Sequence, residues 1–182
     1  MLKKLSVLVA IGLVFLGFIS SAKAEVCPPG ATQVKVKGKI FNNAVGSGTT
    51  LGSVHMILGE KGNQTTMKCG ITGLAQNVYP APGPHFIHTI VCDDQTTDEW
   101  PYSLPNETIH SQITLSTSFE SATFQTCPAG YLLNYFKEKS IPLAGSGRGV
   151  FYGVSGGEIW VTGEMQCSLA IDMDFQGYMS CP

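Results

Sequence analysis

Apolar and polar side chains alternate along several segments, which is the pattern of strands that bury one face. The clearest case lies near the C-terminus, where four apolar side chains alternate with Ala170, Asp172, Asp174 and Gln176; the apolar set is Leu169, Ile171, Met173 and Phe175. Similar patterns predict strands over residues 32–41, 53–58 and 109–119. Residues 86–92 are a continuous apolar run that predicts a further strand, and the chain returns through 65–74 before it; polar turns or loops are expected over 42–50 and 93–106. No segment keeps a helical period, so we expect an all-β chain.

Two further segments refine this expectation. Residues 150–154 and 158–162 are rich in β-branched and aromatic side chains and are separated by Ser155-Gly156-Gly157, which predicts a hairpin with a tight glycine turn. Residues 127–140 fit either a short helix or a strand, because short apolar runs do not settle the period. About eight strands in one domain favour a closed barrel or a sandwich.

The run Gly-Arg-Gly-Val-Phe-Tyr-Gly-Val-Ser-Gly over residues 147–156 resembles the Gly-x-Gly-x-Phe-x-Gly-Ala-x-Gly hairpin of the allene oxide cyclase and dirigent barrel superfamily. Residues 157–163 are similar to the strand that follows it, and the resemblance extends over about 109–181. Val154 stands where alanine is usual and Arg148 where threonine is usual. The resemblance implies a single antiparallel β-barrel of about eight strands over residues 25–182, like the superfamily's secreted bacterial members of unknown function.

The segment 1–24 has the composition of a signal peptide. Lys3 and Lys4 precede an apolar run over positions 5–19, and Ala22-Lys23-Ala24 is a small-x-small cleavage signal. The apolar run is shorter than the roughly 20 residues of a membrane-spanning helix. We therefore expect a secreted or periplasmic protein that has no membrane association after the signal peptide is removed.

The charge of the mature chain argues against nucleic acid or an anionic membrane as a partner. Removing Lys3, Lys4 and Lys23 leaves eight basic and thirteen acidic residues, a formal charge of −5. Nucleic acids and anionic membranes are bound by concentrated basic surfaces, so neither is expected as a partner. Lysines 35, 37 and 39 alternate along one strand, and we interpret them as a solvated outer face.

Six cysteines in an exported chain predict three disulfides. If the tip of a hairpin lies at residues 79–83, Cys69 and Cys92 face each other across it. In a closed even-numbered barrel the first and last strands are neighbours, which pairs Cys27 with Cys181. Cys127 and Cys167 then pair by elimination. The cysteines lack the close spacing of zinc ligands, so no thiolate metal site is expected.

No residue is predicted to be catalytic, to bind a cofactor or to ligate a metal. His85 and His88 lie three apart in a strand and therefore on opposite faces, while His55 and His110 are isolated in the sequence, so all four are interpreted as structural or surface residues. Asp172 and Asp174 share one strand face with the spacing of an acid–base pair, but Gln176 continues that face, which favours a solvated stripe. The acidic segment 93–99 lacks the glycine and spacing of an EF-hand loop. The sequence also contains no nucleophile elbow, P-loop or zinc-protease element.

Two functions are consistent with these observations. The first hypothesis is an exported, soluble barrel that binds a small apolar ligand or a partner surface without catalysis and needs no cofactor. The alternative, implied by the resemblance, is a cavity enzyme, an isomerase or cyclase, although no motif of this chain carries the plant enzymes' catalytic residues over. The second hypothesis requires a polar cluster inside the barrel, and an interior filled by Met, Phe, Ile and Val with no titratable group would exclude it. The oligomeric state is left open.

Overall fold

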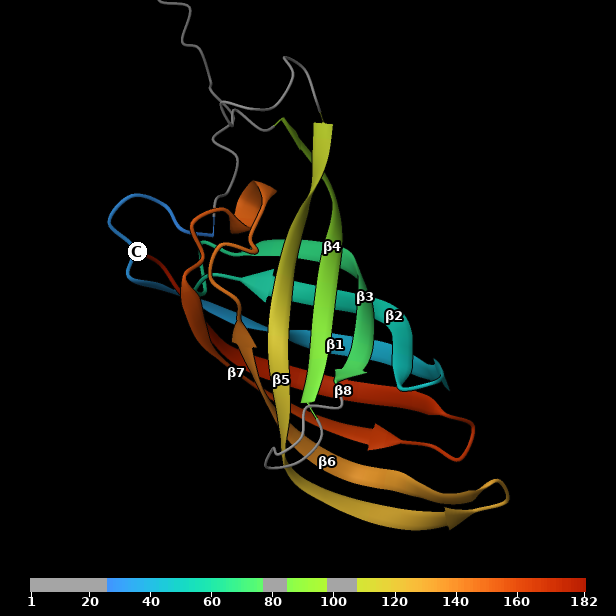
Figure 1. Ribbon diagram of the computed structural model, residues 1–182. Coiled ribbons are helices and arrows are strands. Elements are labelled where there is room, and N and C mark those ends of the chain that lie inside the picture. The colour runs from blue at the N-terminus through green and yellow to red at the C-terminus, as the bar shows by residue number, and fades with distance from the viewer. Residues whose placement is uncertain (1–25, 77–84, 98–107) are drawn as a thin grey trace, which may run out of the picture.

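The chain forms one closed barrel of eight antiparallel strands, in which each strand pairs with the next and the last pairs with the first (Figure 1). The computed structural model describes residues 26–76, 85–97 and 108–182, except for the side chains of 94–97 and 108–109. The strands are β1 (Gln33–Gly46), β2 (Thr49–Leu58), β3 (Thr65–Gln76), β4 (His85–Thr97), β5 (Thr108–Cys127), β6 (Gly130–Pro142), β7 (Gly156–Met165) and β8 (Ala170–Ser180). The predicted all-β barrel is confirmed.

The strands are longer than the alternation indicated. β1 and β2 continue through most of the predicted turn at 42–50 and leave only Ser47 and Gly48 between them. Residues 127–140, which fitted helix or strand, belong largely to β6. The predicted loop at 93–106 is wrong in its first part, because β4 continues to Thr97. The rest of that loop, the predicted signal peptide and the expected hairpin tip at 79–83 lie outside the described residues.

The predicted hairpin at 150–162 is also wrong in its first strand. Gly149–Phe151 forms a single 3₁₀ turn, η1. Gly149 and Gly153, at its start and just after its end, both have positive φ angles, which extended strands do not use. The apolar side chains of this segment are buried in a different way: Phe151 is fully enclosed, and the Val150 N–H donates to Ser111 Oγ at 2.8 Å.

The interior of the barrel is an apolar core supplied by alternate residues of every strand. β8 illustrates this, with Ile171, Met173 and Phe175 buried and the aspartates between them exposed. Gly38 on β1 makes room for the ring of Phe175 on the neighbouring strand, since a methyl group at 38 would overlap both that ring and the His55 carbonyl oxygen. The missing side chain lets the sheet curve tightly around a large aromatic residue. The described part of the chain contains no helix with the length and hydropathy of a membrane span.

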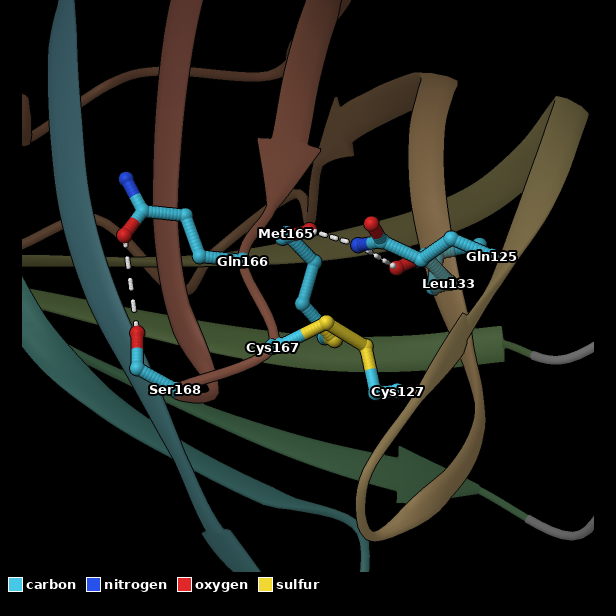
Figure 2. The surroundings of a disulfide bond; sticks show 7 residues. All are labelled: Gln125, Cys127, Leu133, Met165, Gln166, Cys167 and Ser168. Atoms are coloured by element: carbon cyan, nitrogen blue, oxygen red, sulfur yellow. Dashed lines mark hydrogen bonds between the residues drawn. A yellow bond between two sulfur atoms is a disulfide. The ribbon is translucent and has the colours of Figure 1, made fainter.

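Three disulfides connect the pairs of cysteines that the sequence predicted. Cys69 and Cys92 are opposite each other on β3 and β4, and Cys27 joins Cys181 beside the first and last strands. Cys127, at the end of β5, bonds to Cys167 in the β7–β8 turn (Figure 2). Disulfides persist in oxidising compartments, so this set fits an extracellular or periplasmic protein.

Next to the third disulfide, the Gln125 side-chain amide donates to the carbonyl oxygens of Leu133 and Met165 (Figure 2). The long β5–β6 hairpin extends beyond the body of the barrel in Figure 1. Its tip is therefore held to the end of β7 and the β7–β8 turn by the Cys127–Cys167 disulfide and by the hydrogen bond from the Gln125 amide to the Met165 carbonyl oxygen.

Candidate functional site

A small cavity lies inside the barrel and is polar on one side only. Its volume is about 20 Å³, which is room for one water molecule. The polar lining comes from β4 and β6 and consists of His88, Glu138 and Ser140. The apolar lining consists of Ile40, Met56, Ile71, Ile90, Leu115, Ile159, Val161, Met173, Phe175 and Met179. A polar wall therefore faces an apolar wall formed mainly by β7, β8, β1 and β2.

Three polar side chains form a hydrogen-bonded chain across adjacent strands. His88 Nδ1 on β4 lies 3.0 Å from Thr117 Oγ1 on β5, and Thr117 Oγ1 lies 2.7 Å from Ser140 Oγ on β6. The two hydroxyl-bearing residues are almost completely buried. Each hydroxyl can donate or accept, so the chain can run in either direction and can transmit a change in the protonation of His88.

Glu138 projects into the same cavity from β6, two residues before Ser140 and therefore on the same strand face. It is 5 % exposed, and its side chain makes no hydrogen bond or ion pair with any of the described residues. The neighbouring Lys137 and Lys139 face outward, where Lys139 bonds to Glu158 at 2.8 Å. Glu138 is thus a buried acid without a protein partner in the described part of the chain.

Burial shifts both titratable groups of the cavity toward their neutral forms. It raises the pKa of Glu138 from its ordinary 4.5 to about 7, and it lowers the pKa of His88 from 6.5 to about 4. In each case the cause is desolvation, which penalises the charged form. Between pH 4.5 and 6.5 the site therefore holds a protonated carboxyl and a neutral imidazole. The carboxyl can donate a hydrogen bond or a proton, which an ionised glutamate could not do.

Gly73 on β3 completes the surroundings of His88. A methyl group at this position would overlap the imidazole ring of His88 and the hydroxyl of Thr50, so the ring sits in space that only glycine leaves free. Thr50 in turn accepts a hydrogen bond from the Asn42 amide at 3.2 Å. Asn42 Oδ1 is buried and has no partner in the described residues. Polar interior side chains are thus present on β4, β2 and β1, with Gly73 of β3 between the first two.

The structure places the histidines, all interpreted from the sequence as structural or surface residues, in different surroundings. His55 and His110 are exposed, as expected of surface histidines, whereas His88 lies inside the barrel as part of a polar cluster that the sequence did not indicate. Asp172 and Asp174 form the exposed stripe that was predicted. In the described part of the chain, no three His, Cys, Asp or Glu side chains are close enough to hold a metal ion.

Sequence analysis missed the functional candidates on β5 and β6. Thr117 has the same parity as Ile113 and Leu115, so its inward position was contained in the alternation, but a threonine in an alternating strand usually marks the solvent face. Glu138 lies between two lysines, a context typical of a surface. Its parity with Phe136 and Ser140 was the only available signal, and it required knowing that 127–140 is a strand.

Comparisons of the chain with protein-family models, curated proteins and solved structures find no match. The function is therefore argued from the geometry of the barrel.

Proposed function

We propose that the protein is an exported, disulfide-stabilised barrel whose interior binds a small, mainly apolar molecule that carries one polar group. The observation that supports this most is Glu138, a buried acid that faces the cavity without a partner in the described residues. Burial of such a group costs stability unless a hydrogen bond compensates it. Strongly perturbed acids in cavities are candidates for functional sites because a ligand can supply that bond.

The two-sided lining defines the class of ligand. An apolar body would pack against Met173, Phe175 and Val161, while a carbonyl or hydroxyl oxygen would accept a hydrogen bond from protonated Glu138. The hydroxyl of Ser140 lies on the same wall and provides a second polar contact. Ligand pockets commonly combine such a mostly apolar lining with a few placed polar groups.

The cavity must expand to accept this ligand, because even a molecule as small as benzene needs far more room than a single water molecule does. Met56, Met173 and Met179 line the space, and methionine side chains are unbranched and adapt their shape readily. We expect these three side chains to change rotamer when the ligand enters, while the strands keep their positions.

The test is native mass spectrometry of the protein purified from its own source, followed by solvent extraction. We expect an adduct of small-molecule mass that the extraction removes. Glu138→Gln should retain less of it, while Lys61→Gln, which changes an exposed side chain in the turn between β2 and β3, should retain the wild-type amount. An unliganded wild-type protein, or equal retention by the two variants, would refute the proposal.

A second candidate function is a cavity enzyme of the isomerase or cyclase type. Two neutral titratable groups line the cavity, one able to give a proton and the other able to take one, and a hydrogen-bonded chain leads away from His88. In an enzyme, the molecule retained by Glu138→Gln would have the same mass as the wild-type molecule but a different chromatographic retention time, because substrate would accumulate instead of product. Identical molecules from both proteins would favour binding without catalysis.

A further inference from the structure

A broad groove of about 890 Å³ crosses the outer face of the barrel, perpendicular to the strands. It spans six neighbouring strands, from β3 to β6 by way of β2, β1, β8 and β7. The register places its principal side chains in two adjacent rows. We call this surface the cross-strand groove and define it by Lys37, Gln176 and Trp160 in one row and Lys39, Asp174 and Lys137 in the other.

The cross-strand groove is positively charged on a chain that is negative overall. It contains three lysines and one aspartate, whereas the whole chain has a formal charge of −2. Asp174 is paired with Lys39 at 3.1 Å. Lys37 and Lys137 form no ion pair with any described carboxylate. Two ammonium groups in the groove can therefore attract an anionic ligand that the net charge of the chain would otherwise repel.

Trp160 forms the aromatic part of the groove and is held in a fixed orientation. Its indole N–H donates to Glu158 Oε1 at 2.7 Å, and Glu158 also pairs with Lys139 at 2.8 Å. The Nζ of Lys137 lies 4.3 Å from the centre of the indole ring, a cation–π contact. The Nζ of Lys139, which pairs with Glu158, lies 5.5 Å from the centre of the same ring.

We propose that the cross-strand groove binds a linear acidic polysaccharide, with sugar carboxylates on Lys37 and Lys137 and sugar rings against Trp160. The C–H groups of a sugar ring suit the electron-rich face of an indole. The hydroxyl groups of the sugar match Gln176 and the threonine and histidine side chains that line the groove. Neighbouring strands are spaced about 4.8 Å apart, so a groove across six of them accommodates several sugar units in a row.

The topology argues against an acidic peptide as the occupant. Extended peptides commonly bind by adding a strand to a free sheet edge, which supplies backbone hydrogen bonds. Thr66 of β3, at one end of the cross-strand groove, is paired with β2 alone, but β2, β1, β8, β7 and β6 are paired on both sides at their groove residues. A peptide would therefore have only side-chain contacts there, whereas a polysaccharide needs no backbone pairing.

The experiment is calorimetric titration with polygalacturonate at low salt, with dextran as the neutral polymer and polyglutamate as the peptide polyanion. We expect polygalacturonate to bind, dextran not to bind, and polyglutamate to bind at least about tenfold more weakly, with all binding reduced by salt. Lys37→Gln combined with Lys137→Gln should weaken polygalacturonate binding at least about tenfold. Lys61→Gln combined with Arg148→Gln removes the same charge elsewhere and should leave the affinity within about twofold.

Trp160→Ala should also weaken binding, and Trp160→Phe should restore part of it. Thermal unfolding of each variant identifies those that fail to fold. The lysine variants change exposed side chains and should fold, so they still test the binding site if a Trp160 variant does not fold. The proposal is overturned if polygalacturonate does not bind, if polyglutamate binds equally well, or if the two double variants behave alike. Glu138→Gln should not affect this binding, so the result is independent of the interior site.

Discussion

Replacing Glu138 by glutamine should change how stability depends on pH, and the sign follows from the direction of the pKa shift. The folded-state pKa of about 7 lies above the ordinary value of 4.5. Between these values the folded protein holds a proton that the unfolded chain has released, so the contribution of Glu138 to stability is fully present below pH 4.5 and is lost as pH rises through 7. At about 1.4 kcal/mol per pH unit the loss is about 3 kcal/mol. Glutamine does not titrate, so the Glu138→Gln variant does not undergo this loss of stability as pH rises.

His88 has the opposite dependence. Its pKa is lowered from 6.5 to about 4, so its contribution is present above pH 6.5 and is lost as pH falls toward 4, again by about 3 kcal/mol. In the wild-type protein the two pH dependences of the unfolding free energy cancel between about pH 4.5 and 6.5, so Glu138 and His88 together do not change stability in this range. In Glu138→Gln only the increase of stability with pH that is due to His88 remains. The variant should therefore gain about 3 kcal/mol relative to the wild type between pH 4 and pH 8.

Urea unfolding at half-unit steps from pH 4 to pH 8 measures this difference. A suitable control is Glu158→Gln, because the hydrogen bond from Lys139 lowers the pKa of Glu158, and this variant should lose stability at neutral pH instead of gaining it. Any constant cost of burying the glutamine amide cancels in the comparison across pH. A free-energy difference between Glu138→Gln and the wild type that stays constant from pH 4 to pH 8 would show that Glu138 is not a buried neutral acid.

Three other substitutions test the architecture. Gly73→Ala should displace the His88 ring and cost about 1–3 kcal/mol; unchanged imidazole NMR signals would contradict this packing. Phe151→Ala removes a fully enclosed ring and should cost about 3–5 kcal/mol in denaturant unfolding, and a cost below about 1 kcal/mol would mean that the 3₁₀ turn does not belong to the core. Replacing Cys27 and Cys181 together by serine opens the disulfide beside the termini and should remove up to about 5 kcal/mol through the longer loop released in the unfolded chain; a variant as stable as the wild type would indicate that the bond adds nothing beyond strand pairing.

Alternation in the sequence was sufficient to predict most of the strands, but it did not decide between a closed barrel and a sandwich. β8 was identified because Ile171, Met173 and Phe175 alternate with acidic residues, and the expected contact of first and last strands led to the Cys27–Cys181 pair. The hairpin at 150–162 failed because the apolar side chains of a buried turn look locally like those of a strand. Phe151 is buried because η1 packs against β5 and β4, and this packing is a tertiary property.

The interior site was much less accessible to sequence reasoning. His88, Thr117 and Ser140 are far apart in the chain and meet only because β4, β5 and β6 are neighbours in a particular register. A shift of one residue in that register would have placed each of them outside. The environment that neutralises Glu138 likewise comes from side chains of the other strands that line the cavity, which no local pattern describes.

Closure of the barrel by β1 and β8 also sets an order of events for folding. Gln33 pairs with Ser180, so the first strand finds its second neighbour only after nearly the whole chain is available. Contacts between such distant residues slow folding, and until they form, both outer strands present free edges that can pair with other chains. The Cys27–Cys181 bond lies beside this last pairing, which brings the two thiols together, so we expect it to form mainly when the pairing is in place. It therefore serves as a chemical marker of completed barrels, and trapping free thiols at these two positions during refolding would time the closing step.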